Sequence, residues 1–80
     1  MASSDERIKR ADECISQGKR LVEERQYAEA LALFKEALEI DRETRPSRVW
    51  AVLTELGDCY NSIFDHQKAE EAYQEAILST

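Results

Sequence analysis

The two halves of this 80-residue chain repeat each other at a spacing of 39 residues, and this repeat constrains the fold more than any single residue does. Small residues fall on small residues, and large apolar residues fall on large apolar ones. The matched pairs are Gly18 and Gly57, Leu21 and Tyr60, Ala30 and Ala69, Phe34 and Tyr73, Ala37 and Ala76, and Leu38 and Ile77. A repeat of a few dozen residues is typical of arrays of helical hairpins, in which neighbouring units stack to form a shared core.

In the first half, apolar residues at three- and four-residue steps predict two α-helices. The first is expected to begin at Ser3-Ser4-Asp5-Glu6, where Ser3 and Glu6 have the spacing of a capping box, and to end near Glu24. The second is expected to run from Tyr27 or Ala28 to about Glu43, with a polar break of a few residues between the two. So short a break predicts an antiparallel hairpin.

The second half begins after Pro46, because proline disfavours helix in the residue before it and suits the first turn of the next helix. Asp65 is expected to cap the last helix. The apolar stripe of the third helix is expected at Val49, Trp50, Leu53, Leu56, Gly57, Tyr60, Ile63 and Phe64, and that of the fourth at Ala69, Ala72, Tyr73, Ala76 and Ile77. We expect one all-α domain of two antiparallel helix-turn-helix hairpins: repeat 1 over about 5–43, a loop over about 44–47 and repeat 2 over about 48–79.

The residues at the repeated positions resemble the signature of the tetratricopeptide repeat family, W-x2-L-G-x2-Y followed by A-x3-F. The first repeat is the weaker match, since Cys14 and Gln17 stand where the family has large apolar residues. The resemblance implies a short right-handed solenoid that binds other proteins and has no catalytic activity of its own. The signature positions are Gly18, Leu21, Ala30, Phe34 and Ala37 in the first half, and Leu53, Leu56, Gly57, Tyr60, Ala69, Tyr73 and Ala76 in the second.

The glycines of the signature indicate where the two helices of each hairpin approach most closely. Gly18 and Gly57 are expected at these points, since a side chain there would push the helices apart. The facing helices would offer Ala30 and Ala69 as small partners, and an aromatic ring, at position 34 or 73, would fill the groove beside each of these alanines. Packing of ridges into grooves favours this alternation of small and large residues.

Net charge excludes some partner classes. The chain carries 17 acidic and 11 basic residues, a net charge of -6, which argues against nucleic acid as a partner. The local exception is a basic cluster formed by Arg42, Arg45 and Arg48. We interpret it as a solvated loop between the repeats, partly neutralised by Asp41 and Glu43, although it could also meet a phosphate or an acidic partner.

Residues that could carry chemistry are few. The chain has a single histidine, His66, and no glycine-rich loop, so neither an enzyme nor a cofactor or metal site is expected. Cys14 and Cys59 match no disulfide framework and are interpreted as buried free thiols in a reducing compartment. No apolar run approaches the roughly 18 residues of a membrane span, and the first residues do not resemble a signal peptide. These features predict no membrane partner and a cytoplasmic or nuclear location.

Binding of a partner peptide or helix is expected on the first helix of each repeat. In the family, one well-known activity is to clamp an acidic chaperone tail with lysine and asparagine. Here Ile15, Lys19 and Glu55 stand at clamp positions, and Glu55 would repel a terminal carboxylate, so this clamp is not expected. The candidate groove residues are Ile15, Lys19, Val22, Glu23, Thr54, Asp58 and Asn61.

The last helix suggests a second contact surface. Tyr73, Ala76 and Ile77 would be covered by a further helix in a longer array, so they are expected to form an exposed apolar strip. Three interpretations remain open: the chain is the N-terminal part of a longer protein, it pairs with a second copy, or its partner supplies the cover. The alternative function is therefore a small self-assembly domain that dimerises through this helix.

Overall fold

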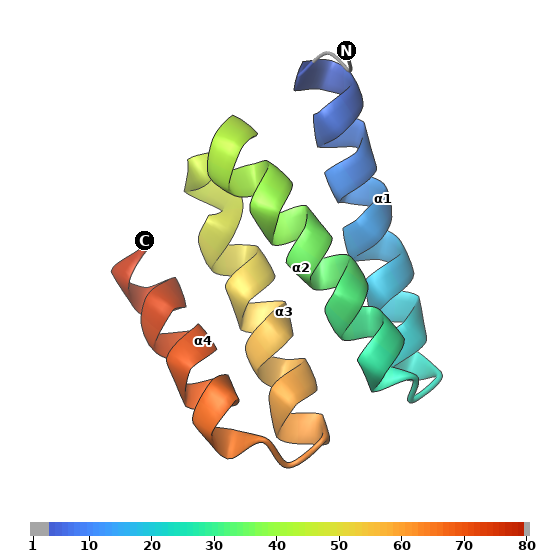
Figure 1. Ribbon diagram of the computed structural model, residues 1–80, viewed down its shortest axis with the longest axis vertical. Helices are drawn as coiled ribbons and strands as arrows, with labels where there is room; N and C mark the ends of the chain where they lie inside the picture. Colours follow the sequence, from blue (N-terminus) through green and yellow to red (C-terminus); the bar gives the residue numbers. More distant parts are fainter. Residues whose placement is uncertain (1–3, 80) are drawn as a thin grey trace.

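The computed structural model describes residues 4–79, which form four α-helices in two hairpins (Figure 1). The helices are α1 (Ser4–Glu23), α2 (Tyr27–Thr44), α3 (Val49–Ser62) and α4 (His66–Leu78), with a short 3₁₀ turn, η1 (Pro46–Arg48), before α3. No strand occurs within the described range, so the predicted all-α fold of two antiparallel hairpins is confirmed. The predicted capping role of Ser3 lies outside the described residues.

The helices lie side by side in chain order, each antiparallel to the next, and form a flat slab of 38 × 29 × 15 Å (Figure 1). Both hairpin turns lie at one end of the slab, and η1 lies at the other. Contacts join α1 to α2, α2 to α3 and α3 to α4. The core is therefore a thin layer of side chains between successive helices.

The turn between α1 and α2 places Arg25 in the left-handed region, with φ of 63°. Around it the amide of Gln26 donates to the carbonyl of Leu21 at 2.8 Å, and the amide of Arg25 donates to that of Val22 at 3.0 Å. These two bonds satisfy carbonyls at the end of the helix, as in a Schellman motif. The backbone therefore reverses within three residues.

The turn between α3 and α4 repeats this geometry 39 positions later, with Phe64 at φ of 64° and the amide of Asp65 donating to the carbonyl of Tyr60 at 2.8 Å. The prediction that Ile63 and Phe64 belong to the apolar stripe of the third helix is wrong, because α3 ends at Ser62. Their side chains are 43% and 81% exposed. A bulky residue at positive φ is strained, and this position normally favours glycine.

The start of α4 follows the prediction. A side-chain oxygen of Asp65 accepts a hydrogen bond from the backbone amide of Lys68 at 3.3 Å, which is the expected N-cap. A carboxylate at this position also interacts favourably with the positive end of the helix dipole.

The signature glycines lie directly under aromatic rings. A Cβ atom at Gly18 would lie 2.6 Å from Cε1 of Phe34, and one at Gly57 would lie 2.5 Å from Cε1 of Tyr73. The predicted close packing at both glycines is thus present, with each ring stacked on the glycine itself. Ala30 is completely buried and Ala69 almost so.

Arg45, in the segment between the repeats, forms hydrogen bonds with both helices of the first hairpin. Its Nη2 atom donates to Oδ1 of Asp12 at 2.9 Å, and its Nε atom donates to Oδ1 of Asp41 at 3.1 Å. The Asp41 side chain is fully buried. Burial acts to lower the pKa of the Arg45 guanidinium, but its hydrogen bonds to Asp12 and Asp41 outweigh this effect and the pKa is raised.

The interpretation of the basic cluster as a solvated loop is therefore wrong for Arg45, whose side chain is only 18% exposed. Arg42 lies within α2 rather than in the loop and pairs with Glu75 of α4. Arg48 remains exposed. The predicted neutralisation by Asp41 is correct, and it takes place in the interior, since Asp41 is fully buried, whereas Glu43 pairs with Arg7 instead.

Candidate binding surface

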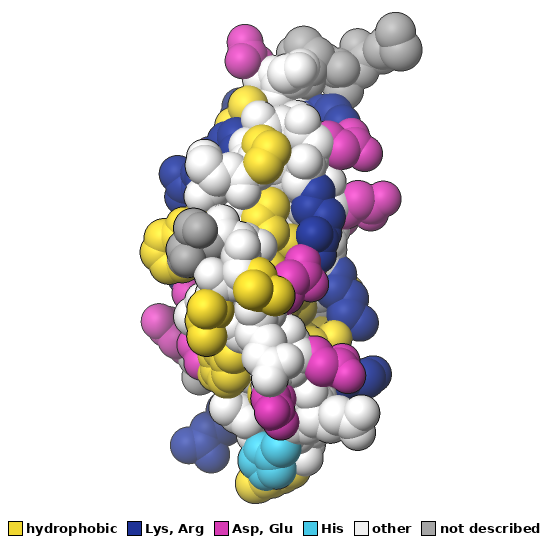
Figure 2. Space-filling view, turned by 90° about the vertical axis from the view of Figure 1, so that its left-hand side faces the viewer, with side chains coloured by type: hydrophobic (Ala, Val, Ile, Leu, Met, Phe, Trp, Pro, Cys, Tyr) yellow, Lys and Arg dark blue, Asp and Glu magenta, His cyan; other side chains and the backbone are white. Residues whose placement is uncertain are grey.

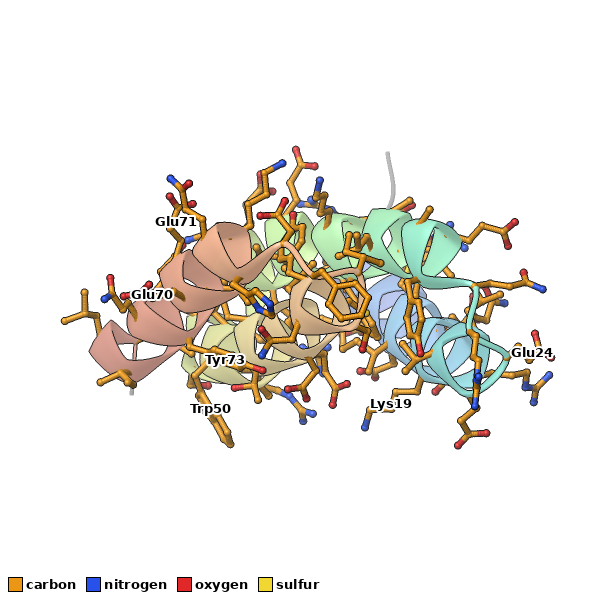
Figure 3. All side chains as sticks on the ribbon, turned by 90° about the horizontal axis from the view of Figure 1, so that it is seen from below. Lys19, Glu24, Trp50, Glu70, Glu71 and Tyr73 are labelled. Carbon is orange, nitrogen blue, oxygen red and sulfur yellow. The ribbon has the colours of Figure 1, made fainter. Side chains whose placement is uncertain are left out.

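The slab has two faces, which are visible when it is viewed from the turn end (Figure 3). Helices α1 and α3 form the lower face in this view, and α2 and α4 form the upper one. Lys19 of α1 and Trp50 of α3 extend from the lower face, whereas Glu71 of α4 extends from the upper side. We call the surface formed by α1 and α3 the α1/α3 face.

Two predicted groove residues, Ile15 and Lys19, line a shallow hollow on this face between α1 and α3. The Nζ atom of Lys19 lies 3.9 Å from Oε1 of Glu55 across the hollow, and both side chains are partly exposed. An exposed ion pair of this kind contributes about 0–1 kcal/mol, so it can open for a ligand. The remaining lining residues are Arg48, Ala51 and Val52.

The other predicted groove residues lie elsewhere. The Thr54 hydroxyl donates to the backbone carbonyl of Trp50 at 2.9 Å, and Val22 packs against the core. Thr54, Val22 and the exposed Glu23 do not line the hollow. The structure therefore divides the predicted groove into a part beside α1 and a part beside α4.

Asp58 and Asn61 belong to a chain of hydrogen bonds that reaches α4. The Tyr73 hydroxyl donates to Oδ1 of Asp58, and Nδ2 of Asn61 donates to the Tyr73 hydroxyl at 3.3 Å. Nδ1 of His66 lies 3.0 Å from Oδ1 of Asn61. The hydrogen bond to Asp58 raises the pKa of the Tyr73 hydroxyl, and burial adds to this effect. These contacts hold the Tyr73 ring over Gly57.

The prediction of an exposed apolar strip formed by Tyr73, Ala76 and Ile77 is wrong for two of these residues. Tyr73 is half-buried, and Ala76 is only 6% exposed because it packs into the core between α3 and α4. Of the three predicted residues only Ile77 is exposed, at 70%, and it is joined by Leu78 at 85%. Figure 2, which faces this side of the slab, shows hydrophobic side chains exposed among acidic ones.

Trp50 is the residue of this surface that the sequence analysis missed. It was predicted on the buried stripe of the third helix, but its side chain is 45% exposed and projects from the α1/α3 face (Figure 3). The buried arc of α3 is set by Val49, Val52, Leu53 and Leu56. Trp50 lies outside that arc, on the same side as Thr54 one turn later. In the sequence, this polar residue four positions away was the sign that Trp50 lies on an exposed side of the helix.

A comparison with models of protein families decides the assignment. The family model described as Tetratricopeptide repeat matches residues 21–77. The chain belongs to the tetratricopeptide repeat family. The resemblance predicted from the signature residues is confirmed, and the family indicates a module that binds other proteins. Comparisons with curated proteins and with solved structures give no significant match.

The matched part of this tetratricopeptide repeat chain begins at Leu21 and leaves out most of α1. That helix contains Cys14 and Gln17, the positions at which the first repeat departs from the family pattern. The fold of α1 is nevertheless that of a first hairpin helix, because it packs along α2 with Ala11, Cys14 and Gly18 buried.

Both thiols of the tetratricopeptide repeat chain are free and buried, as predicted. Burial is the main reason that the pKa of Cys59 rises to about 11, with Glu55 and Asp58 adding to it, and burial also raises the pKa of Cys14. A thiol with so high a pKa is a poor nucleophile at neutral pH. These residues therefore act as small apolar side chains of the core.

Within residues 4–79 no three side chains of the His, Cys, Asp and Glu types are grouped so that they could hold a metal ion. None of the helices in the same range combines the length and apolar character needed to cross a membrane.

Proposed function

We propose that this tetratricopeptide repeat chain is a non-enzymatic protein-interaction module that binds a short segment of a partner protein on its α1/α3 face. The observation that carries the proposal is the exposed Trp50, on the face that contains the hollow lined by Ile15, Ala51 and Val52. Tryptophan is among the residues most enriched where binding energy concentrates. The buried free thiols support a reducing compartment, the cytoplasm or the nucleus.

The chemistry of the hollow favours an apolar side chain over a carboxylate as the anchor. Its floor is apolar, and its only acidic lining residue, Glu55, would oppose a terminal carboxylate. The Lys19–Glu55 ion pair could exchange for polar contacts to the backbone or flanks of the bound segment. This supports a binding mode with one or two apolar anchors and polar flanks, different from the chaperone-tail clamp.

Peptides selected against the immobilised chain from a random-sequence display library provide the test. Trp50→Ala should weaken the binding of a selected peptide at least about tenfold, and Ile15→Asp should have an effect of similar size, because both remove apolar contact on the α1/α3 face. Gln74→Ala, an exposed change on α4, should leave the affinity unchanged. Circular dichroism checks that each variant remains helical. Failure to enrich any peptide, or equal affinities for all three variants, would contradict the proposal.

Self-assembly through α4 is the second candidate function, and the exposure of Ile77 and Leu78 favours it. Sedimentation velocity over a range of concentrations should then show a dimer that Ile77→Lys and Leu78→Lys each abolish, because a buried lysine in an apolar contact is costly. Ala28→Lys, an exposed change at the start of α2, should not affect the dimer. A monomer at all concentrations would rule this function out without affecting the first.

A further inference from the structure

The opposite side of the slab carries a second groove, between α2 and α4. Its floor is apolar and is formed by Leu38 of α2 with Leu53 and Leu56 of α3. Its volume of about 300 Å³ has room for a few side chains but not for a whole helix. An ion pair between Arg42 and Glu75 joins α2 to α4 toward the η1 end.

The end of this groove nearer the hairpin turns is basic. The Nζ atoms of Lys35, from α2, and Lys68, from α4, lie 5.9 and 5.8 Å from the centroid of the same Tyr60 ring. All three residues line the groove. Within the part of the chain that the structure describes, neither lysine forms a salt bridge. Arg42, in contrast, is paired with Glu75. The two lysines lack such an ion pair among the described residues although the chain has a net charge of -6.

The approach of two ammonium groups to one ring makes this end of the groove favourable for an anion. The ring attracts each cation through its negative face, but it does not remove the repulsion between the two. A carboxylate placed at this end of the groove would be attracted by both groups. A carboxylate further along the groove would instead meet Glu71 of α4, and Glu75 beyond it is already paired with Arg42. The unpaired positive charge that attracts an acidic side chain therefore lies at the Tyr60 end of the groove.

We propose that the α2/α4 groove binds a partner segment in which an aspartate or glutamate is followed by aliphatic side chains. The carboxylate lies at the end of the groove that Lys35 and Lys68 make basic, and the aliphatic side chains cover the leucine floor. This site is on the opposite side of the slab from the α1/α3 face, and it uses none of the residues that line the hollow there.

Two synthetic peptides test the proposal: acetyl-Gly-Asp-Leu-Leu-Gly-amide and the same peptide with asparagine in place of aspartate. Titrated into the isotope-labelled chain, the aspartate peptide should shift amide resonances along α2 and α4. The asparagine peptide should bind about tenfold more weakly, because it loses its attraction to two partly exposed ammonium groups, each worth about threefold. Equal affinities for the two peptides, no binding, or shifts confined to α1 and α3 would each overturn the proposal.

Variants of the chain complete the experiment. Lys35→Gln and Lys68→Gln should each weaken the aspartate peptide about threefold, and the double variant should bring it to the level of the asparagine peptide. Lys9→Gln provides the matched control, because it makes the same change at an exposed position of α1. Trp50→Ala should have no effect on this peptide, which separates the groove from the proposed α1/α3 surface. A peptide affinity that Trp50→Ala lowers, or that the two groove variants leave unchanged, would contradict the assignment.

Discussion

The Gly18→Leu substitution is expected to lower the free energy of unfolding by at least about 3 kcal/mol, at the upper end of the usual cost of overpacking. Even a Cβ atom at this position would lie 2.6 Å from the Phe34 ring, which is fully buried between α1 and α2 and has no space to move into. An 80-residue domain has little stability to spare, so this variant should be largely unfolded at room temperature. Urea unfolding followed by circular dichroism measures the effect.

The same change at Gly57 should cost less, although its Cβ atom would lie as close to a ring. Tyr73 is only half-buried and can swing toward solvent at the expense of its hydrogen bond to Asp58. A double variant supplies the control: in a Tyr73→Leu background the ring is absent, and Gly57→Ala should then stabilise α3 by up to about 1 kcal/mol through helix propensity. Equal losses at Gly18 and Gly57, or a loss in that background, would contradict the proposed contacts.

Arg45→Met is expected to destabilise the chain by about 3–5 kcal/mol, because it leaves the buried Asp41 carboxylate without its cation. The second carboxylate oxygen, Oδ2, already has no hydrogen-bond partner among the described residues. The free energy of unfolding of the variant, compared with that of the wild type at neutral pH, gives the value.

Two further variants show whether the buried charge is the cause. Asp12→Asn changes the exposed partner of Arg45 and should cost less than about 1 kcal/mol. In the double variant with Asp41→Leu and Arg45→Met, apolar side chains replace both buried charges, and most of the lost stability should return. A double variant no more stable than Arg45→Met alone would show that the guanidinium acts through packing instead.

The helices and their packing could be predicted from the sequence because they depend on short-range patterns. The steps of three and four residues, the break at Pro46 and the capping position of Asp65 are all local, and the 39-residue repeat relates the two hairpins without any further information. The close packing at the two glycines could be predicted because a glycine at equivalent positions in both repeats indicates that no side chain fits there.

The edges of the buried surface were harder to predict. A helical period locates the centre of an apolar stripe, but Trp50 and Ile63 lie at its margin, where the position of the neighbouring helix decides exposure. Phe64 was assigned to a helix because its left-handed conformation is unusual for an aromatic residue.

Long-range polar contacts explain the remaining differences. The burial of Asp41 depends on Arg45, which follows the end of α2, and a single charged residue on a helix gives no indication of that pairing. On the α1/α3 face, Ile15 and Lys19 lie beside α3, whereas Asp58 and Asn61 form hydrogen bonds with Tyr73 that no pattern of spacing reveals. The roles of these residues in binding remain predictions.

Helix α3 is shared between the two sides of the slab. Val52 lines the hollow on the α1/α3 face, and its neighbour Leu53 forms part of the floor of the groove between α2 and α4. A ligand that displaces or tilts α3 on one side therefore changes the shape of the surface on the other. Two ligands bound in this way would be energetically coupled, and the coupling would be reciprocal: each would alter the affinity for the other by the same factor.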